Sequence, residues 1–195
     1  DLVFCASYSG NTEETLSAYA EAKKSGARII ALTSGGNLAE RAKADGFPVI
    51  TIPGGYPPRT ALGLMLMPVI AVCQRLKLLP AIDFEKAFEL CKAGIDSWKV
   101  ENTGENVAKK LALACHGKMV ALYGLGPWQG VIASRWKGQI NENAKSIALA
   151  STFPELNHNE ILGWVGVGAQ GSDGLGQRVR CVAVGVRIST SPHRG

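Results

Sequence analysis

The sequence has little that would place the chain in a membrane or around a metal ion. Its longest apolar stretch, residues 61–73, contains Gly63 and Pro68 and is shorter than the roughly 20 residues that span a bilayer. The five cysteines are odd in number, widely spaced and free of any CxxC pair. Such cysteines are typical of small buried side chains in a reducing compartment. We therefore expect no membrane segment, no metal site and a cytoplasmic location.

The charge balance gives little support for a nucleic-acid partner. The net charge is +5, and residues 165–195 hold four arginines and one acid (4 − 1 = +3), which leaves 5 − 3 = +2 for residues 1–164. That larger part has no basic stripe with interleaved aromatic residues, so we expect no nucleic acid among the partners. A GxGxxG motif and a Walker lysine are also missing, which disfavours a nucleotide site.

Short β-rich runs alternate with helical patterns, which is typical of parallel βαβ units. In the first part of the chain we expect strands at residues 2–6, 28–33 and 48–52, and helices at 12–25, 37–45 and 61–79. Two amphipathic helices are expected at residues 84–99 and 105–114. The alternation then resumes, with strands at 118–123 and 146–150 around a helix at 128–145. The sequence therefore predicts an α/β fold with two parallel-sheet regions.

These patterns divide the chain into four expected parts. Residues 1–79 form a first α/β domain, 80–116 a helical connector, 117–164 a second α/β domain and 165–195 an atypical tail. The tail is rich in glycine, poor in acids and without a helical period, although residues 179–188 favour a strand. The first residues contain no methionine and no basic residue, so we interpret them as a strand entered part-way along.

The segment Ser7-Tyr8-Ser9-Gly10-Asn11-Thr12 lies between an expected buried strand and an expected helix. Ligands of open parallel sheets bind beyond the carboxyl ends of the strands, and a helix N-terminus there supplies N–H groups that suit a phosphate. Ser7, Ser9 and Thr12 add hydroxyl donors. The same residue types also cap helices and fill turns, so from spacing alone a cap made by Asn11 or Thr12 is an equal alternative.

This segment resembles the sugar-phosphate loop of the SIS (sugar isomerase) family. The resemblance implies that the hydroxyls of Ser7, Ser9 and Thr12 hold the phosphate of a phosphosugar. Residues 53–55 and 58–63 are similar to the stretch after the third strand in the bifunctional phosphoglucose/phosphomannose isomerases of that family. This similarity implies that Arg59 adds a charge-assisted contact to the phosphate. A solvated arginine at a helix start is the alternative for Arg59.

A second block resembles the second SIS domain of the same isomerases, and its most discriminating element is residues 154–160, Pro-Glu-Leu-Asn-His-Asn-Glu. The resemblance implies that Glu155 moves a proton between C2 and C1 of the sugar through a cis-enediolate, which a carboxylate of raised pKa can do. Composition alone favours a surface glutamate at that position. His158 either assists ring opening or proton transfer to oxygen, or orients the loop by hydrogen bonding.

The resemblance runs from residue 1 to Trp164, where we expect it to stop. It implies two flavodoxin-like SIS domains of three layers, joined by helices and both incomplete. We attribute the start and the tail to a truncated or frame-shifted coding sequence. The family's ring-opening histidine has no clear match: His193 stands in a different residue order, and His116 fits a cation at a helix C-terminus better.

The implied activity is isomerisation of glucose 6-phosphate, and of mannose 6-phosphate, to fructose 6-phosphate. The resemblance also implies a homodimer that needs no cofactor. Two alternatives stay open. One is a non-catalytic SIS module that senses a phosphosugar, and the other is an inactive fragment of the isomerase.

Overall fold

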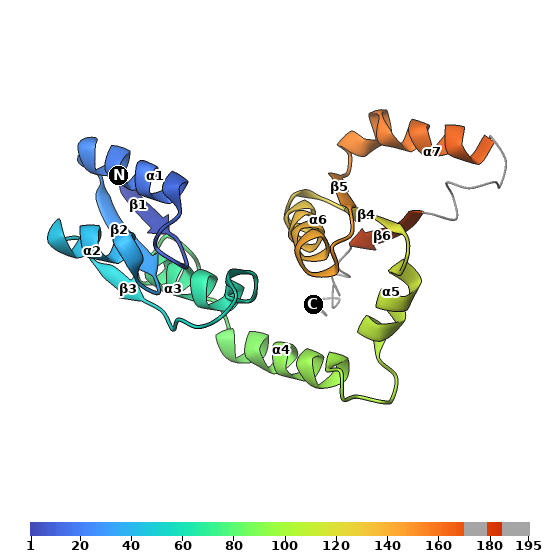
Figure 1. The fold of residues 1–195 in the computed structure, drawn as a ribbon, viewed down its shortest axis with the longest axis horizontal. Coiled ribbons are helices and arrows are strands. Elements are labelled where there is room, and N and C mark those ends of the chain that lie inside the picture. Colours follow the sequence, from blue (N-terminus) through green and yellow to red (C-terminus); the bar gives the residue numbers. More distant parts are fainter. Residues whose placement is uncertain (170–178, 185–195) are drawn as a thin grey trace, which may run out of the picture. The chain divides into compact units, whose positions relative to one another are not determined.

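The computed structural model describes residues 1–169 and 179–184, and it is a mixed α/β structure with two parallel sheets (Figure 1). The chain divides into two compact units, Asp1–Phe84 and Glu85–Gly195. The predicted fold class, α/β with parallel sheets, is confirmed. The four-part division, the three-layer arrangement and the incompleteness of the domains stay predictions.

The first unit is built on three parallel strands in the order β1-β2-β3, which are β1 (Leu2–Ala6), β2 (Arg28–Thr33) and β3 (Val49–Thr51). Helices α1 (Glu13–Lys24) and α2 (Gly36–Ala44) connect the strands. After β3 come the short 3-10 helix η1 (Pro58–Thr60) and α3 (Leu62–Arg75). The predicted helix 61–79 ends early, because Lys77 adopts a left-handed backbone (φ 59°) and the Leu78 amide turns back to the Cys73 carbonyl at 2.8 Å.

Both α1 and α2 pack on one face of this sheet. The core between them consists of Cys5, Tyr19, Ile29, Ala31, Leu38 and Ala42. At the C-terminal ends of the two helices, the Tyr19 hydroxyl donates to Asp45 Oδ2 at 2.7 Å and Lys23 Nζ donates to Asp45 Oδ1 at 2.6 Å. Because α1 follows β1 and α2 follows β2 in the chain, the N-terminal ends of both helices lie at the loops after these strands.

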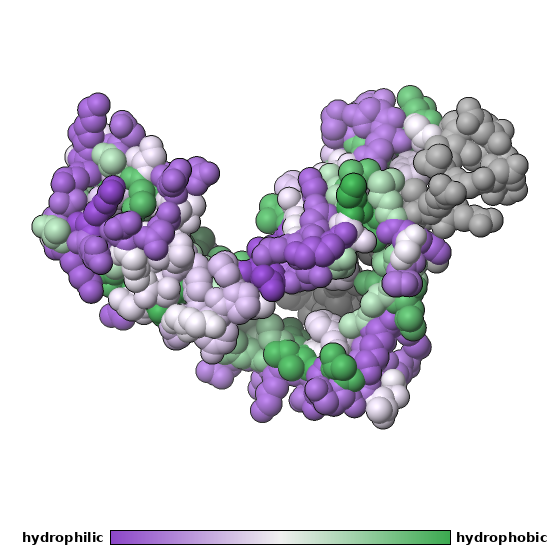
Figure 2. Space-filling view, in the orientation of Figure 1, coloured by the Kyte–Doolittle hydropathy of each residue, from purple (hydrophilic) through white to green (hydrophobic). Residues whose placement is uncertain are grey.

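Two helices begin the second part of the chain, α4 (Phe84–Trp98) and α5 (Val107–Cys115). Neither helix has a buried residue in the described structure. Four large apolar side chains of α4 are exposed: Phe88, Leu90, Ile95 and Trp98. Figure 2 shows patches of hydrophobic (green) surface along this helix. An apolar helix surface of this kind is typical of a segment that packs against something else.

The second sheet has the order β5-β4-β6, with all strands parallel: β4 (Met119–Gly124), β5 (Ala148–Thr152) and β6 (Val179–Val184). Helix α6 (Pro127–Gln139) packs on β4 and β5 and continues as a π-helical turn, η2 (Ile140–Ala144). The helix comes very close to the strands, since a Cβ at Gly130 would lie 2.4 Å from Thr152 Oγ1. Only glycine fits there, and it brings the start of α6 against the strand ends.

The segment after β5 is more regular than the sequence predicts. It contains the 3-10 helix η3 (Glu155–His158), and α7 (Glu160–Ala169) follows directly. A tail without a helical period is expected from residue 165, and for residues 165–169 this expectation is wrong because they belong to α7. The expected strand at 179–188 is confirmed for Val179–Val184, which pairs with β4 along its whole length, and residues 185–188 lie outside the described residues.

Candidate functional site

The loop after β1 gathers the three predicted hydroxyls on one turn. Ser7 Oγ lies 2.7 Å from Thr12 Oγ1 and accepts a hydrogen bond from the Gly10 amide at 3.1 Å. Ser9 Oγ accepts from the Asn11 amide at 3.2 Å. Ser7 is buried, whereas Ser9 and Thr12 are exposed. The buried hydroxyl therefore shapes the turn, while the other two face solvent.

The predicted side-chain cap of α1 is wrong. Thr12 does stand at the N-cap position, but its side chain makes no capping hydrogen bond, because its hydroxyl is engaged with Ser7. The other candidate, Asn11, accepts from the Asn37 amide at 3.0 Å at the start of α2. Within the described residues, the first turn of α1 thus keeps its N–H groups free of a capping side chain, and such a turn attracts anions.

The loop after β2 supports this turn. Gly10 has φ 71°, and a Cβ added to it would lie 1.8 Å from the Gly35 carbonyl oxygen, so the two loops are in direct backbone contact. The Tyr8 carbonyl oxygen accepts from the Ser34 amide at 2.9 Å and from the Ser34 hydroxyl at 2.7 Å. Position 10 requires glycine for two reasons: its backbone is left-handed, and a side chain there would collide with the Gly35 carbonyl oxygen.

The loop after β3 joins the same edge of the sheet through Tyr8. The Tyr8 hydroxyl donates to the Pro53 carbonyl oxygen at 3.1 Å and accepts from the Tyr56 amide at 2.9 Å. Arg59 follows in η1 and is half-buried. The loops after β1, β2 and β3 therefore form one connected surface at the carboxyl ends of the strands.

In the second unit, the predicted catalytic residues lie in η3, directly after β5. The Phe153 amide donates to the Gly124 carbonyl oxygen at 2.9 Å, and the following peptide bond to Pro154 is cis. Glu155 and His158 are both exposed. Glu155 Oε1 accepts a hydrogen bond from Asn159 Nδ2 at 3.1 Å. The structure thus places both residues at a strand end, and it gives Glu155 one hydrogen-bonded oxygen.

A carboxylate cluster beside η3 is absent from the sequence-based predictions. Glu160 Oε1 accepts from the Tyr123 hydroxyl at 2.8 Å, and Glu160 Oε2 accepts from the Ser151 hydroxyl. The Tyr123 hydroxyl in turn accepts from Trp164 Nε1 at 2.6 Å. Glu160 does belong to the discriminating element at residues 154–160, but its hydroxyl partners lie 9 and 37 positions earlier in the chain.

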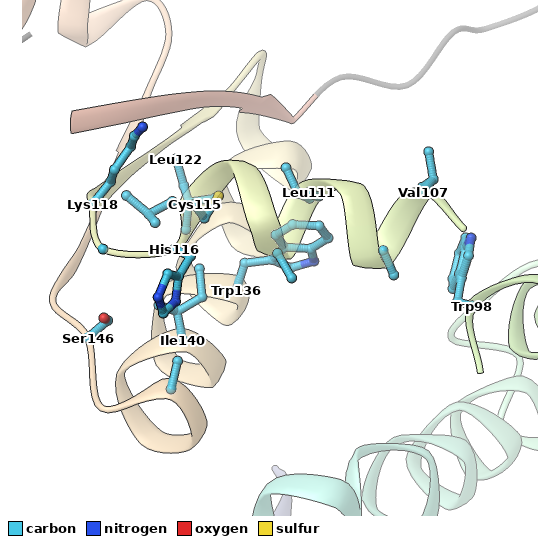
Figure 3. A pocket seen from close by; sticks show the side chains of 15 residues that line it. Trp98, Val107, Leu111, Cys115, His116, Lys118, Leu122, Trp136, Ile140 and Ser146 are labelled. Carbon is cyan, nitrogen blue, oxygen red and sulfur yellow. The ribbon is translucent and has the colours of Figure 1, made fainter. Parts of the chain in front are cut away.

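A cavity of the second unit lies elsewhere (Figure 3). It has a volume of about 760 Å³ and lies between α5, α6 and β4. Its lining is mainly apolar, with His116, Lys118 and Ser146 at one end, and among the described residues it includes no carboxylate and none of the predicted site residues. The polar groups that converge at the strand ends therefore lie outside this cavity.

Across residues 1–169 and 179–184, no group of three or more His, Cys, Asp or Glu side chains is arranged to hold a metal ion. In the same part of the chain, no helix is both long and apolar enough to cross a bilayer.

The chain is similar to known enzymes over most of its length. Residues 104–193 match the family described as the bacterial phospho-glucose isomerase C-terminal SIS domain. The bifunctional phosphoglucose/phosphomannose isomerase of Caldicellulosiruptor bescii is 49% identical over 165 residues, which cover 83% of this chain and 49% of the relative. That of Aquifex aeolicus is 42% identical over 163 residues, or 84% of this chain and 48% of the relative. This chain is a homologue of the bifunctional phosphoglucose/phosphomannose isomerases.

The chain spans about half the length of these isomerases. The family match also continues past Trp164 to residue 193, so the expectation that the resemblance stops at Trp164 is wrong. Among solved structures, a proposed phosphosugar isomerase from Clostridium difficile 630 has a TM-score of 0.56 at 15% identity, over 98% of this chain and 53% of that one. At that identity the likeness shows the SIS fold alone.

Proposed function

We propose that this chain supplies two working parts of a phosphoglucose/phosphomannose isomerase. The first unit binds the phosphate of the substrate, and the second provides the carboxylate that moves the proton. The homologues' names support the reaction class, and the position of Glu155 at a strand end, with one oxygen held by Asn159, is the observation that carries the assignment.

Phosphate binding falls to the loop after β1. Ser9 and Thr12 present exposed hydroxyls, and the uncapped first turn of α1 adds backbone N–H groups and the positive end of the helix dipole. Ser7 sets the shape of that turn through its two hydrogen bonds. Arg59 contributes its guanidinium, which can donate two parallel hydrogen bonds to phosphate oxygens.

Proton transfer falls to Glu155. The carboxylate removes the proton from C2 of the open-chain aldose, the electron pair moves to form the cis-enediolate, and the same carboxyl group returns the proton to C1. The oxygen at C1 gains a proton and the oxygen at C2 loses one, so the atoms balance without an external oxidant or reductant. His158 serves the proton transfer to oxygen or orients the loop, and no cofactor is needed for either role.

Substitution of Glu155 tests the base. We expect Glu155→Gln to lower kcat for conversion of fructose 6-phosphate to glucose 6-phosphate by about 10²–10⁴-fold, the usual contribution of a general base. In D₂O, the carboxyl group exchanges its proton with solvent, so deuterium should appear at C2 of the product. The exposed Glu101→Gln is the matched control and should keep full activity. Full turnover by Glu155→Gln would mean that another group is the base.

Phosphosugar binding without turnover is the second candidate function. A carboxylate base works best when partial burial raises its pKa, yet Glu155 is exposed in this chain. Fructose 6-phosphate would then raise the melting temperature of the chain while the isomerase assay stays at background. An inactive fragment of the isomerase would also give background activity in the isomerase assay, but fructose 6-phosphate would not raise its melting temperature.

Mannose 6-phosphate is proposed as an additional substrate, because both C2 epimers give the same cis-enediolate. The same assay started from mannose 6-phosphate tests this. We also propose a homodimer, since the apolar side chains exposed on α4 fit a surface that a second copy covers. Light scattering behind a sizing column would give the mass. The free cysteines of the described residues are compatible with the cytoplasm, where we place the protein.

A further inference from the structure

Glu160 is a half-buried carboxylate with a fixed set of hydrogen-bond donors. It begins α7, and each of its oxygens accepts from a hydroxyl at the end of a different strand, Tyr123 on β4 and Ser151 on β5. Tyr123 and Ser151 are paired across the two parallel strands. The carboxylate therefore clamps the first turn of α7 to two adjacent strand ends.

The directions of these hydrogen bonds follow from the donor inventory. An indole N–H can only donate, so Trp164 donates to the Tyr123 oxygen. The Tyr123 hydroxyl proton is then directed to Glu160, which also receives the Ser151 proton. Each carboxylate oxygen of Glu160 thus has a hydroxyl donor from a different strand.

A chain of contacts links this clamp to Glu155. The Glu160 amide donates to Asn159 Oδ1 at 2.5 Å, and Asn159 Nδ2 donates to Glu155 Oε1 at 3.1 Å. The side chain of Asn159 thus connects the carboxylate assigned as base to the residue that is fastened to the sheet. Movement of the first turn of α7 would move this amide and the Glu155 oxygen that it holds.

We propose that Glu160 is the positioning residue of the segment that carries Glu155. Its carboxylate fixes the start of α7 to β4 and β5, and through Asn159 it sets the orientation of the Glu155 carboxylate. The role in turnover rests on the proposed isomerase function. The hydrogen bonds of the clamp do not depend on that function, so an experiment can contradict the positioning role and the proposed function separately.

Kinetics of Glu160→Gln test the role in turnover, with Glu101→Gln as the matched control. Glutamine cannot accept from both hydroxyls without presenting its own NH₂ group to one of them. We expect kcat to fall at least tenfold while KM for fructose 6-phosphate changes less than threefold, because phosphate binding falls to the other unit. Glu160→Gln combined with Glu155→Gln should be no slower than Glu155→Gln alone, since both act on one step. Unchanged kcat, or additive losses, would overturn the positioning role.

Hydrogen exchange tests the clamp even if the chain shows no turnover. In Glu160→Gln the amides of residues 155–164 should exchange at least tenfold faster, whereas the amides of β4 and β5 keep their rates. Ser151→Ala removes one donor and should give a smaller change in the same segment. Equal exchange in wild type and Glu160→Gln would overturn the proposal, and so would faster exchange throughout the second unit, which indicates general destabilisation. Background turnover by the wild type would count against the proposed function alone.

Discussion

The Tyr8 hydroxyl donates a hydrogen bond to the Pro53 carbonyl oxygen, 45 positions along the chain, at 3.1 Å. The same oxygen accepts from the Tyr56 amide. One side chain of the loop after β1 thus holds the loop after β3, which leads to Arg59. This side chain therefore helps to set the placement of the hydroxyls relative to the guanidinium assigned to phosphate binding.

Removing that hydroxyl should weaken phosphosugar binding. A hydrogen bond contributes about 0.5–1.5 kcal/mol, so we expect Tyr8→Phe to raise the Kd for fructose 6-phosphate by about three- to tenfold. Titration calorimetry measures the change. Tyr56→Phe is the matched control, because only its backbone amide takes part in the contact and its ring is exposed. Equal affinities for Tyr8→Phe and wild type would show that the connection does not set the site.

Ser7 and Ser9 should respond differently to alanine. Ser7→Ala removes a buried acceptor of the Gly10 amide, so it should lower the stability of the first unit by about 1–3 kcal/mol and also weaken binding. Ser9→Ala removes an exposed hydroxyl and should weaken binding with little loss of stability. Urea unfolding and calorimetry on both variants separate the effects. Similar stability losses would contradict the division of roles.

Two glycines with the same backbone conformation offer a matched test of the contact between loops. Gly10 has φ 71° and Gly26 has φ 73°, but a Cβ at Gly26 meets nothing within 4 Å, whereas one at Gly10 meets Gly35. Gly26→Ala should cost only the left-handed strain of about 1–2 kcal/mol. Gly10→Ala should cost clearly more and also abolish binding. Equal melting temperatures for the two variants would show that the loops separate easily.

Asp45 should make the first unit sensitive to acid. The hydrogen bonds from Lys23 and then from Tyr19 hold the pKa of Asp45 below its ordinary value. Its stabilisation is therefore present above the unfolded pKa of about 3.9 and is lost as the pH falls through the lower folded value. Hydrogen exchange of α1 and α2 should accelerate below about pH 4 in wild type and less so in Asp45→Asn.

The control for this prediction is Asp96→Asn. Asp96 forms an exposed pair with Lys99 in the other unit, so its loss should leave the acid response of α1 and α2 unchanged. A wild-type acid response identical to that of Asp45→Asn would mean that another group dominates.

Local sequence signals account for much of the fold. The strand predicted at residues 28–33 has the observed bounds, because an apolar run stands between the turn-forming Gly26 and Ser34. The hydroxyl loop after β1 was likewise predictable from its position between a buried strand and a helix. Both features depend on residues that are close in sequence.

Contacts between distant residues account for what the sequence did not reveal. A local rule assigns the Asn11 side chain to the start of α1, but it accepts instead from the Asn37 amide, 26 positions along the chain. From the sequence alone, Glu160 is expected to be a solvated glutamate. In the structure, β4 brings Tyr123, 37 positions earlier in the chain, into hydrogen-bonding contact with it. Such partners depend on how strands are ordered in the sheet, which no short motif encodes.

The central claim is that this chain takes part in isomerisation through Glu155. The most direct test is NMR of fructose 6-phosphate incubated in D₂O with the wild-type chain, and in parallel with Glu155→Gln. The account predicts glucose 6-phosphate carrying deuterium at C2 with the wild type, and a rate lower by about 10²–10⁴-fold with the variant. Binding of fructose 6-phosphate without any conversion by the wild type, or equal rates for the two proteins, would contradict it.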